Sequence, residues 1–455
     1  MRTETDQLTL SEAAQRVRDG ELTSTELMRR AIEVADSHDA ALGVFLARFT
    51  ETALDAARHA DTAVATGVPL GPLHGVPVGV KDILATREGP TTAQSNAWDP
   101  EWGRGDATAV ARLRAAGAIV VGKTTTMEFA YGVPARTDPF PLPANPWNPG
   151  TWPGGSSSGT GAGTAAGMML GGLGTDTAGS VRVPAAMCGI TGLKPTFGLV
   201  PVDGCIPLAF SADHIGPMAR TVEDCGLLLD VLADRPVRDG APSGRLDGVR
   251  IGVDRLAPVT DGGGDPSVPG LLDAALAALA GLGADVVEVR LPLYRELTDA
   301  VFLSVAAERL AYHQPWLAQR WSTYGRSARL GMARGAYYSA ADYVQAQRVR
   351  RVGQERLAGV FADVDAVVTP TASIAAPPLE GIEDCLASWK QLVHTTYWNA
   401  TGNPAMSVPM GGTADGMPIG LQIAGTPGDE QAVLRIGEAY QRATDWHRQR
   451  PRMEG

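Results

Sequence analysis

The sequence predicts an α/β fold in which a large mixed central β-sheet is covered by helices on both faces. Apolar runs of strand length alternate with stretches of helical periodicity, first near residue 76 and again from about residue 270. Such alternation is typical of a parallel or mixed sheet between layers of helices. With 455 residues, 44% of them hydrophobic and 20% charged, the chain has an ordinary globular composition and can bury a large core.

The N-terminal segment is predicted to be helical. Ser11 can cap the first helix, and Thr23 with Glu26 forms a capping box for the second. The third is expected to end at Gly67, because glycine readily adopts the left-handed conformation that closes a helix. The predicted helices cover residues 12–19, 24–37 and 51–66.

Strand and helix signals continue through the rest of the chain. An apolar strand at residues 76–80 ends at Lys81, and a strand at residues 118–121 is expected to lead into a turn at Gly122. Seven prolines between residues 134 and 153 exclude regular structure there. The other predicted strands cover residues 285–289, 366–369, 405–409 and 418–424, and the other helices cover residues 106–116, 270–282 and 430–444.

Residues 296–361 are predicted to be mostly helical and rich in aromatic side chains. We expect these rings to pack in a core rather than to form a substrate wall, because an aromatic stripe is usually core. The residues concerned are Trp316, Trp321, Tyr324, Tyr337, Tyr338 and Tyr343.

Charge and hydropathy exclude several classes of protein. The chain has 39 Lys and Arg against 50 Asp and Glu, a formal net charge of −11, which argues against a nucleic acid or membrane partner. No uncharged apolar run reaches the roughly 18 residues that a bilayer span needs. The first residues lack the apolar core of a signal peptide, so we expect a cytoplasmic protein.

The cysteines predict neither a disulfide framework nor a metal site. Cys188, Cys205, Cys225 and Cys385 show no CxxC spacing, and we expect buried thiols in a reducing compartment. No HExxH or other compact ligand set occurs, so no metal and no other cofactor is predicted.

Three short motifs match known expressions in surroundings that do not suit them. Residues 117–124 fit the phosphate-loop pattern, but their four central residues form a strand rather than an open loop. Residues 161–166 approximate a dinucleotide fingerprint without a preceding strand. Residues 155–159 match the G-x-S-x-G elbow of α/β hydrolases, but a turn precedes them. The histidines that could serve such an elbow stand in no telling context: His214, His313, His394 and His447.

Lys81 offers a different base for the many serines in glycine-rich loops. A lysine with its ordinary pKa of about 10.4 is neutral about one time in a thousand near pH 7.4, a deficit of about 4 kcal/mol. Burial can lower a lysine pKa by about 3 to 5 units, which offsets most of that deficit. A lysine that points to solvent is the alternative for this segment taken alone.

A series of longer motifs carries a family resemblance. The central runs are Gly154-Gly-Ser-Ser-Ser-Gly159 and Gly174-Thr-Asp-Thr-Ala-Gly-Ser-Val-Arg-Val-Pro184. The others are Gly75-Val-Pro-x-x-x-Lys81-Asp, Gly122-Lys-Thr, Glu128-Phe-Ala, Asn145-Pro-Trp-Asn-Pro, Gly192-Leu-Lys-Pro-Thr196, Asp213-His-x-Gly-Pro217 and Asp415-Gly-x-Pro-x-Gly-Leu-Gln422. In this order they resemble the amidase signature family of serine hydrolases, which implies the amidase signature fold.

The resemblance implies a Ser, cis-Ser, Lys triad. By motif position, Lys81 matches the base, Ser156 the bridging serine and Ser180 the nucleophile. The peptide before the bridging serine is cis in the family, and Gly155 is sterically compatible with that geometry.

The resemblance also implies roles for the residues around the triad. Backbone N–H groups of one turn should hold the negative oxygen that develops on the substrate, namely those of Thr177, Ala178, Gly179 and Ser180. Five further side chains should support the site, with ordinary hydrogen bonding within the fold as the alternative for the first three: Thr175, Asp176, Arg182, Ser157 and Ser158.

Three positions depart from the family pattern. Ser158 and Ala178 stand where many relatives have glycine, and Thr125 stands where asparagine is common. Alanine at position 178 would be strained if that residue needed a positive φ. Because a Thr-Ala-Gly-Ser variant also occurs among allophanate-hydrolase-like members, we expect Ala178 to be tolerated and to hint at carbamoyl-type substrates.

The expected organisation is a single amidase domain over residues 1–455. It comprises N-terminal helices (1–70), a signature core (71–235) and the remainder of the sheet (236–455). The last part carries a helical substrate-pocket insertion at about residues 296–361.

The leading functional hypothesis is a stand-alone amidohydrolase that cleaves C–N bonds of small amides through an acyl-enzyme, with anilides, carbamates and esters as further candidate substrates. One alternative is the A-type subunit of a glutamine-dependent tRNA amidotransferase, and another is an allophanate or carbamoyl-type hydrolase. A catalytically inactive binding module remains a third. The expected partner is a small amide-type substrate, and both a monomer and a homodimer are open.

Overall fold

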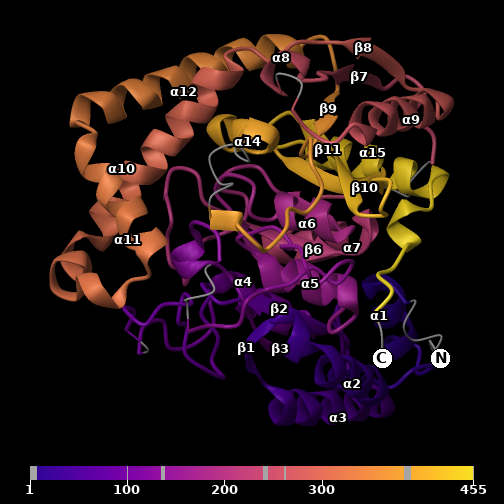
Figure 1. The fold of residues 1–455 in the computed structure, drawn as a ribbon. Helices are drawn as coiled ribbons and strands as arrows, with labels where there is room; N and C mark the ends of the chain where they lie inside the picture. The colour runs from indigo at the N-terminus through magenta and orange to yellow at the C-terminus, as the bar shows by residue number, and fades with distance from the viewer. Residues whose placement is uncertain are drawn as a thin grey trace.

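The computed structural model describes residues 8–99, 101–134, 139–238, 244–260, 263–383 and 391–453. Within them lies one 11-stranded mixed sheet of order β1-β3-β2-β4-β6-β5-β10-β11-β9-β7-β8 (Figure 1). The strands are β1 (Phe45–Arg48), β2 (Pro77–Lys81), β3 (Ile119–Thr124), β4 (Gly171–Asp176), β5 (Thr191–Lys194), β6 (His214–Ala219), β7 (Arg250–Val253), β8 (Asp285–Glu288), β9 (Ala366–Pro370), β10 (Ala405–Gly412) and β11 (Pro418–Gly425). The predicted α/β class with a large mixed sheet is confirmed.

The sheet is parallel in two places and antiparallel elsewhere. Strand β2 runs parallel to both β3 and β4, and β7 runs parallel to both β8 and β9. The other neighbours, among them β4 with β6 and β10 with β11, are antiparallel. Because β2 and β4 are parallel neighbours, the residues at their C-terminal ends lie side by side.

Helices cover both faces of the sheet. The α-helices in the described residues are α1 (Leu10–Arg18), α2 (Ser24–Leu42), α3 (Thr50–Thr66), α4 (Thr108–Ala115), α5 (Ser158–Ala166), α6 (Arg182–Cys188), α7 (Val222–Ala233), α8 (Ala257–Thr260), α9 (Ser267–Gly281), α10 (Tyr294–Arg320), α11 (Arg326–Ala333), α12 (Ala340–Phe361), α14 (Thr396–Thr401) and α15 (Glu430–Ala443). Short 3-10 turns are η2 (Glu128–Ala130), η3 (Trp321–Thr323), η4 (Arg334–Tyr337) and η5 (Trp446–Arg448).

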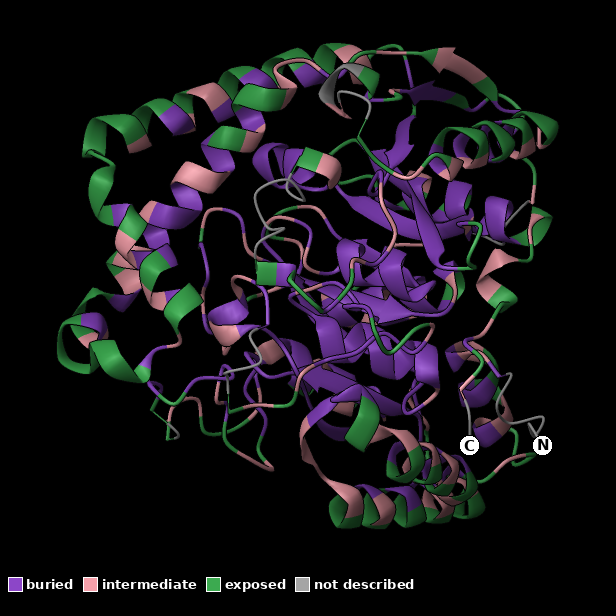
Figure 2. Ribbon diagram, in the orientation of Figure 1, coloured by how far each residue is buried: buried purple, intermediate pink, exposed green. Residues whose placement is uncertain are grey.

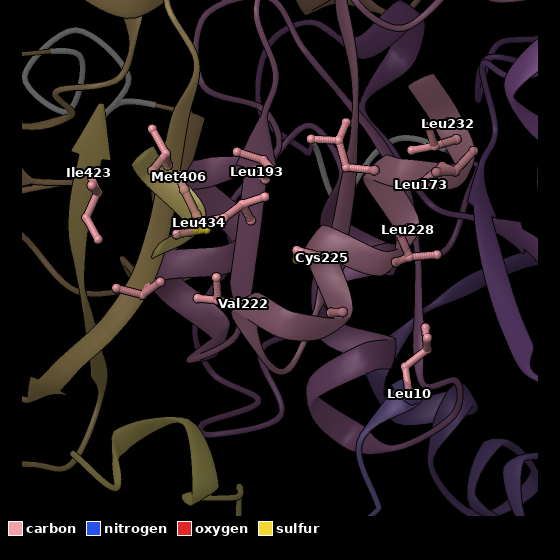
Figure 3. Packing of buried hydrophobic residues seen from close by; sticks show 14 of the residues in the cluster. Leu10, Leu173, Leu193, Val222, Cys225, Leu228, Leu232, Met406, Ile423 and Leu434 are labelled. Atoms are coloured by element: carbon pink, nitrogen blue, oxygen red, sulfur yellow. The ribbon is translucent and has the colours of Figure 1, made fainter. Parts of the chain in front are cut away.

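The largest apolar core lies between one face of the sheet and α1, α4, α7, α9 and α15. Figure 3 shows part of it, with Leu173 and Leu193 from the sheet, Leu10 from α1, and Val222 and Leu228 from α7. On the other face, smaller clusters bring in α5, α6 and α14. The arm formed by α10, α11 and α12 projects beyond the sheet, and its outer surfaces are exposed (Figures 1 and 2).

The glycine-rich segment forms the centre of the molecule. Every residue of α5 is buried, which only small side chains permit at this packing distance. In the sheet, a Cβ at Gly172 would overlap the backbone oxygen of Gly79 on the adjacent strand. The small residues therefore let β2, β4 and α5 approach closely.

Two predictions of single elements need correction. Thr9, not Ser11, caps α1 in a capping box with Glu12, because its side chain accepts the Glu12 N–H. The turn predicted at Gly122 is wrong, because β3 continues to Thr124 in register with β1 and β2.

Other predictions of elements are confirmed. The Thr23 and Glu26 capping box begins α2, and residues 294–361 are mostly helical. Neither a helix nor a strand occurs in the described part of the proline-rich segment, residues 139–153. Residues 135–138 and Cys385 lie outside the described residues. Within the described residues, no helix has the length and apolarity to cross a bilayer.

Candidate active site

The residues singled out in the sequence come together where β2 and β4 end. Lys81 is the last residue of β2, and Thr175 and Asp176 close β4. Ser156 lies in the loop before α5, and Ser180 lies in the turn between β4 and α6. The backbone N–H of Ser157 donates to the backbone carbonyl oxygen of Ser180 at 3.1 Å. This hydrogen bond ties the loop to the turn.

Lys81 is fully buried. Its Nζ lies 2.7 Å from Ser156 Oγ and 2.7 Å from Thr175 Oγ1. Burial lowers the pKa of the Lys81 ammonium to about 7, although nearby acidic groups act in the opposite direction. Among the described carboxylates none forms an ion pair with this amine, so near neutral pH a substantial fraction of it is uncharged.

Ser156 follows a cis peptide bond from Gly155, the geometry that the resemblance implies. Its neighbours hold the loop in place. Ser157 Oγ accepts the N–H of Thr175 at 3.2 Å, and Ser158 Oγ donates to the oxygen of Gly154 at 2.6 Å. Both serines therefore support the loop, and Ser157 joins it to the end of β4.

The turn that carries Ser180 is built around a buried ion pair between Asp176 and Arg182 at 2.8 Å, with both side chains fully buried. Burial alone raises the pKa of the Asp176 carboxyl, but the Arg182 charge and hydrogen bonds outweigh it and hold that pKa well below its usual range. The carboxylate also accepts the backbone N–H groups of Gly179 at 2.8 Å and Val181 at 3.2 Å.

This geometry corrects one predicted oxyanion donor. The Gly179 N–H points to Asp176 rather than to the cavity, because the buried carboxylate needs donors. The backbone N–H groups of Thr177, Ala178 and Ser180 have no acceptor among the described residues and remain available. These three N–H groups are the candidate oxyanion donors.

The alanine at position 178 fits the turn. The positive φ, 126°, falls on Gly179, and Ala178 is not among the described residues with positive φ. A Cβ at position 179 would overlap the Thr395 hydroxyl, so glycine is required there. Thr395 and Thr396 both donate to the oxygen of Ala178, at 2.7 and 3.1 Å, and fix the peptide plane.

Supporting residues that the sequence interpretation did not single out come from later parts of the chain, namely Asp213, Asn399 and Gln422. Arg182 donates to Gln422 Oε1 at 2.8 Å and to Asn399 Oδ1 at 2.6 Å. Thr177 Oγ1 donates to Asp213 Oδ1 at 2.6 Å. Asp213 and Gln422 stand within recognised motifs, and these motifs were the sequence signal that could have identified them as supporting residues. Asn399 lies in no such motif.

The rejected motifs have structural explanations. Lys123, of the phosphate-loop match, is buried in β3 and pairs with Asp82 at 3.1 Å. Residues 161–166 lie inside α5, which follows a loop rather than a strand. His214 and His394 are buried and bond other groups: His214 contacts backbone oxygens and Lys194, and His394 contacts Ser373 and Tyr294.

A cavity of about 110 Å³ opens beside these residues. Ser156 and Ser180 both line it, together with the turn from Thr177 to Gly179. Ser180 is half-buried, in contrast to Lys81. A substrate carbonyl in the cavity can therefore reach the Ser180 hydroxyl while the lysine stays out of water.

Comparison with known proteins identifies the family. The amidase family profile matches residues 26–434. The chain is 39% identical to the A-type subunit of the glutamyl-tRNA(Gln) amidotransferase of Roseiflexus sp. (strain RS-1), covering 98% of both chains. It is 37% identical to the putative amidase AmiD of Mycobacterium bovis, over 98% of this chain and 96% of that one. A crystal structure described as an amidase superposes with a TM-score of 0.87 at 29% identity, covering 96% of this chain and 99% of the other.

Lys81 is buried against Ser156 and Thr175, and Ser156 and Ser180 line one cavity at the C-terminal ends of β2 and β4. The chain belongs to the amidase family. The resemblance to the amidase signature enzymes and the expectation of an amidohydrolase that acts on C–N bonds are thereby confirmed.

Proposed function

We propose that the chain is a stand-alone amidase that uses Lys81, Ser156 and Ser180 as a catalytic triad. The observation that carries the proposal is the buried Lys81 amine, 2.7 Å from the Ser156 hydroxyl, with a pKa lowered to about 7. An uncharged amine in this place can act as a general base, which protonated lysine cannot.

The proposed cycle begins with two proton transfers. Neutral Lys81 takes the proton of Ser156, Ser156 takes the proton of Ser180, and Ser180 Oγ attacks the acyl carbon. General-base assistance of this kind contributes roughly 10²- to 10⁴-fold. The oxygen that becomes negative is held by the N–H groups of Thr177, Ala178 and Ser180, where loss of one donor costs about 2.7 to 4 kcal/mol.

The cycle closes by returning the proton. The relay protonates the leaving nitrogen, the C–N bond breaks, and the acyl group remains as an ester on Ser180. Water then repeats the sequence, giving up its proton to the relay and releasing the acid. No step uses a cofactor. We further propose that the enzyme works in the cytoplasm. We also propose that it has no nucleic acid or membrane partner, which its net charge of −11 supports.

The second candidate is the A-type subunit of a tRNA amidotransferase, because several relatives at 37–39% identity carry that name. Glutamine brings an α-ammonium and an α-carboxylate. None of the described residues that line the cavity is charged, so neither group would find a counter-charge there. This supports the stand-alone amidase over the amidotransferase role.

The test is turnover by the purified chain alone. We expect hydrolysis of simple amides, anilides or p-nitrophenyl esters, and labelling of Ser180 by a fluorophosphonate. Ser180→Ala and Lys81→Ala should each abolish turnover while the circular dichroism of the fold is retained. An active Ser180→Ala variant would falsify the triad assignment, and activity that requires glutamine and a partner protein would favour the amidotransferase role.

A further inference from the structure

The cavity beside Ser180 is small and mostly apolar. Its volume of about 110 Å³ is well below the roughly 300 to 1,000 Å³ of typical ligand pockets, so the position of each wall decides what fits. Beyond the loops of the triad, the larger side chains on its walls are Tyr131, Trp152, Val183, Leu208, Phe302, Val305 and Val393. A charged group entering here would lose water without gaining a counter-charge among the described walls.

Tyr131 reaches the cavity from an unusual backbone. The two preceding residues, Phe129 and Ala130, have φ of 51° and 59°. Left-handed conformations are uncommon for residues other than glycine and cluster at functional sites. Two hydrogen bonds anchor the start of this turn: the Phe129 N–H donates to the backbone oxygen of Ala93 at 2.9 Å, and the Glu128 carboxylate accepts the N–H of Gly325 at 2.9 Å.

The Tyr131 ring is held from one side by Arg309 of α10. The guanidinium carbon lies 3.5 Å from the ring centroid. Arg309 is 1% exposed, forms no ion pair with a described carboxylate, and its Nε and Nη1 lack hydrogen-bond partners. Stacking on an aromatic face accounts for a buried cation in this state. Arg309 follows the cavity residues Phe302 and Val305 on the same face of α10.

Gly331 of α11 leaves the space that the ring needs. A Cβ at this position would lie 2.5 Å from the Tyr131 Cε1 atom. The backbone oxygen of Gly331 also accepts a hydrogen bond from Arg309 Nη2. Arg309 and Gly331 together fix the position of the Tyr131 ring in the cavity wall.

We propose that Tyr131, positioned by Arg309 and Gly331, is a specificity-determining residue that limits the length of an uncharged apolar group in the substrate. This rests on the proposed amidase function and names its substrate class: amides or esters with a short, neutral, apolar group beside the scissile bond. A substrate with a carboxylate in that place is excluded.

Two substrate series test the length limit. One varies the acyl chain of p-nitrophenyl esters from acetate to octanoate, and the other varies the N-alkyl chain of acetamides. Wild type should show a fall in kcat/KM with length in one series, which identifies the side of the substrate that enters the cavity. Replacing the terminal methyl of a tolerated chain by a carboxylate should lower kcat/KM by roughly 100-fold or more, because the cavity offers that charge no partner.

Substitutions test whether Tyr131 sets the limit on the length of the substrate chain. Tyr131→Ala should raise the long-to-short ratio of kcat/KM roughly 10-fold, since one or two methylenes are worth this much in an apolar pocket. Tyr131→Phe keeps the ring and should leave the ratio unchanged. Gly331→Ala should shorten the accepted chain, whereas the matched control Gly359→Ala, on an open surface of α12, should not.

The ratio of two substrates on one preparation is independent of the fraction of protein that is folded. A wild type that labels at Ser180 and turns over but shows no length limit overturns the inference and leaves the amidase function standing, as does a ratio unchanged by Tyr131→Ala. Preference for the carboxylate-bearing substrate overturns it equally. A wild type that neither labels nor turns over any substrate overturns the amidase proposal itself.

Discussion

Lys81 and Lys123 are both buried lysines on adjacent strands, yet their surroundings differ. Lys123 lies 3.1 Å from the Asp82 carboxylate, which stabilises its charged form. Lys81 faces two hydroxyl groups instead, and hydroxyls do not neutralise an ammonium ion. This difference in partners supports a structural role for Lys123 and the proposed role of Lys81 as the base.

The first prediction concerns pH. Because the proposed base must be uncharged, kcat/KM should fall about tenfold per pH unit below the Lys81 pKa of about 7 and level off above it. The measurement is a pH profile of kcat/KM for a neutral substrate, since kcat/KM reports groups of the free enzyme. A profile that stays flat down to pH 5 would contradict the assignment.

The second prediction is that Lys81→Met stabilises the fold at neutral pH while abolishing turnover. Lowering the pKa from 10.5 to about 7 corresponds to about 4 to 5 kcal/mol of burial penalty in the wild type. Loss of the contacts to Ser156 and Thr175 removes part of that gain, at about 1 kcal/mol each. We expect a net gain of about 1 to 3 kcal/mol in urea unfolding at pH 7.

The sign of the pH dependence provides the control. A lysine with a depressed folded pKa destabilises the fold fully below pH 7, and this penalty disappears as pH rises towards 10.5. The stability gap between Lys81→Met and wild type should therefore shrink by roughly 1.4 kcal/mol per pH unit above pH 7. A gap that stays constant between pH 7 and about pH 10 would show that Lys81 is charged in the folded protein.

At the scale of elements, Arg182 joins the serine turn to helices and strands far along the chain. Its guanidinium bonds Asp176, the oxygen of Thr395 and the side chain of Gln422, partners 6, 213 and 240 residues away. One side chain thus fixes the turn before α6 against α14 and β11. The rigidity of this turn is what aligns its N–H groups.

The third prediction is that Arg182→Met destabilises the protein by about 3 to 5 kcal/mol, because it leaves Asp176 buried without its partner. Urea unfolding should report the loss, together with reduced labelling of Ser180. The matched control is Arg351→Met, whose ion pair with Glu355 is exposed and should be worth about 0 to 1 kcal/mol. Equal effects of the two substitutions would refute a special role for the buried pair.

Elements with strong local signals could be predicted from sequence, and others could not. The Thr23 capping box and the apolar runs of β9 and β11 carry their structure in adjacent residues. Strand β6 contains a proline and α5 contains three glycines, so local propensity argues against both. Both are formed by tertiary contacts that periodicity does not reveal: α5 packs where only small side chains fit, and β6 is paired with β4 and β5.

At the scale of the whole molecule, the residues of the site come from separate parts of the chain. Only some of these parts carry motifs that a sequence reveals. The three proposed catalytic residues lie between positions 81 and 180, in compact motifs that could be recognised. The direction of the Gly179 N–H could not be predicted, because it depends on which N–H groups the buried Asp176 carboxylate accepts. The cavity walls Phe302 and Val393 come from segments without any recognisable pattern.

The fourth prediction follows from this division. Replacing residues 294–361 by the corresponding helices of another amidase should retain fluorophosphonate labelling of Ser180, because the arm supplies no proposed catalytic residue. The ranking of substrates should change, because Phe302, Val305 and the residues that hold Tyr131 all lie in the exchanged segment. Competitive turnover of mixed substrates would measure it, and an unchanged ranking would speak against the arm as a determinant.

The projecting arm, formed by α10, α11 and α12, is therefore a suitable place for engineering this protein. Because the three proposed catalytic residues lie outside the arm, whereas Phe302 and Val305 of the cavity wall lie within it, a chimera or a focused library confined to the arm can vary part of the cavity wall and leave those three residues unchanged.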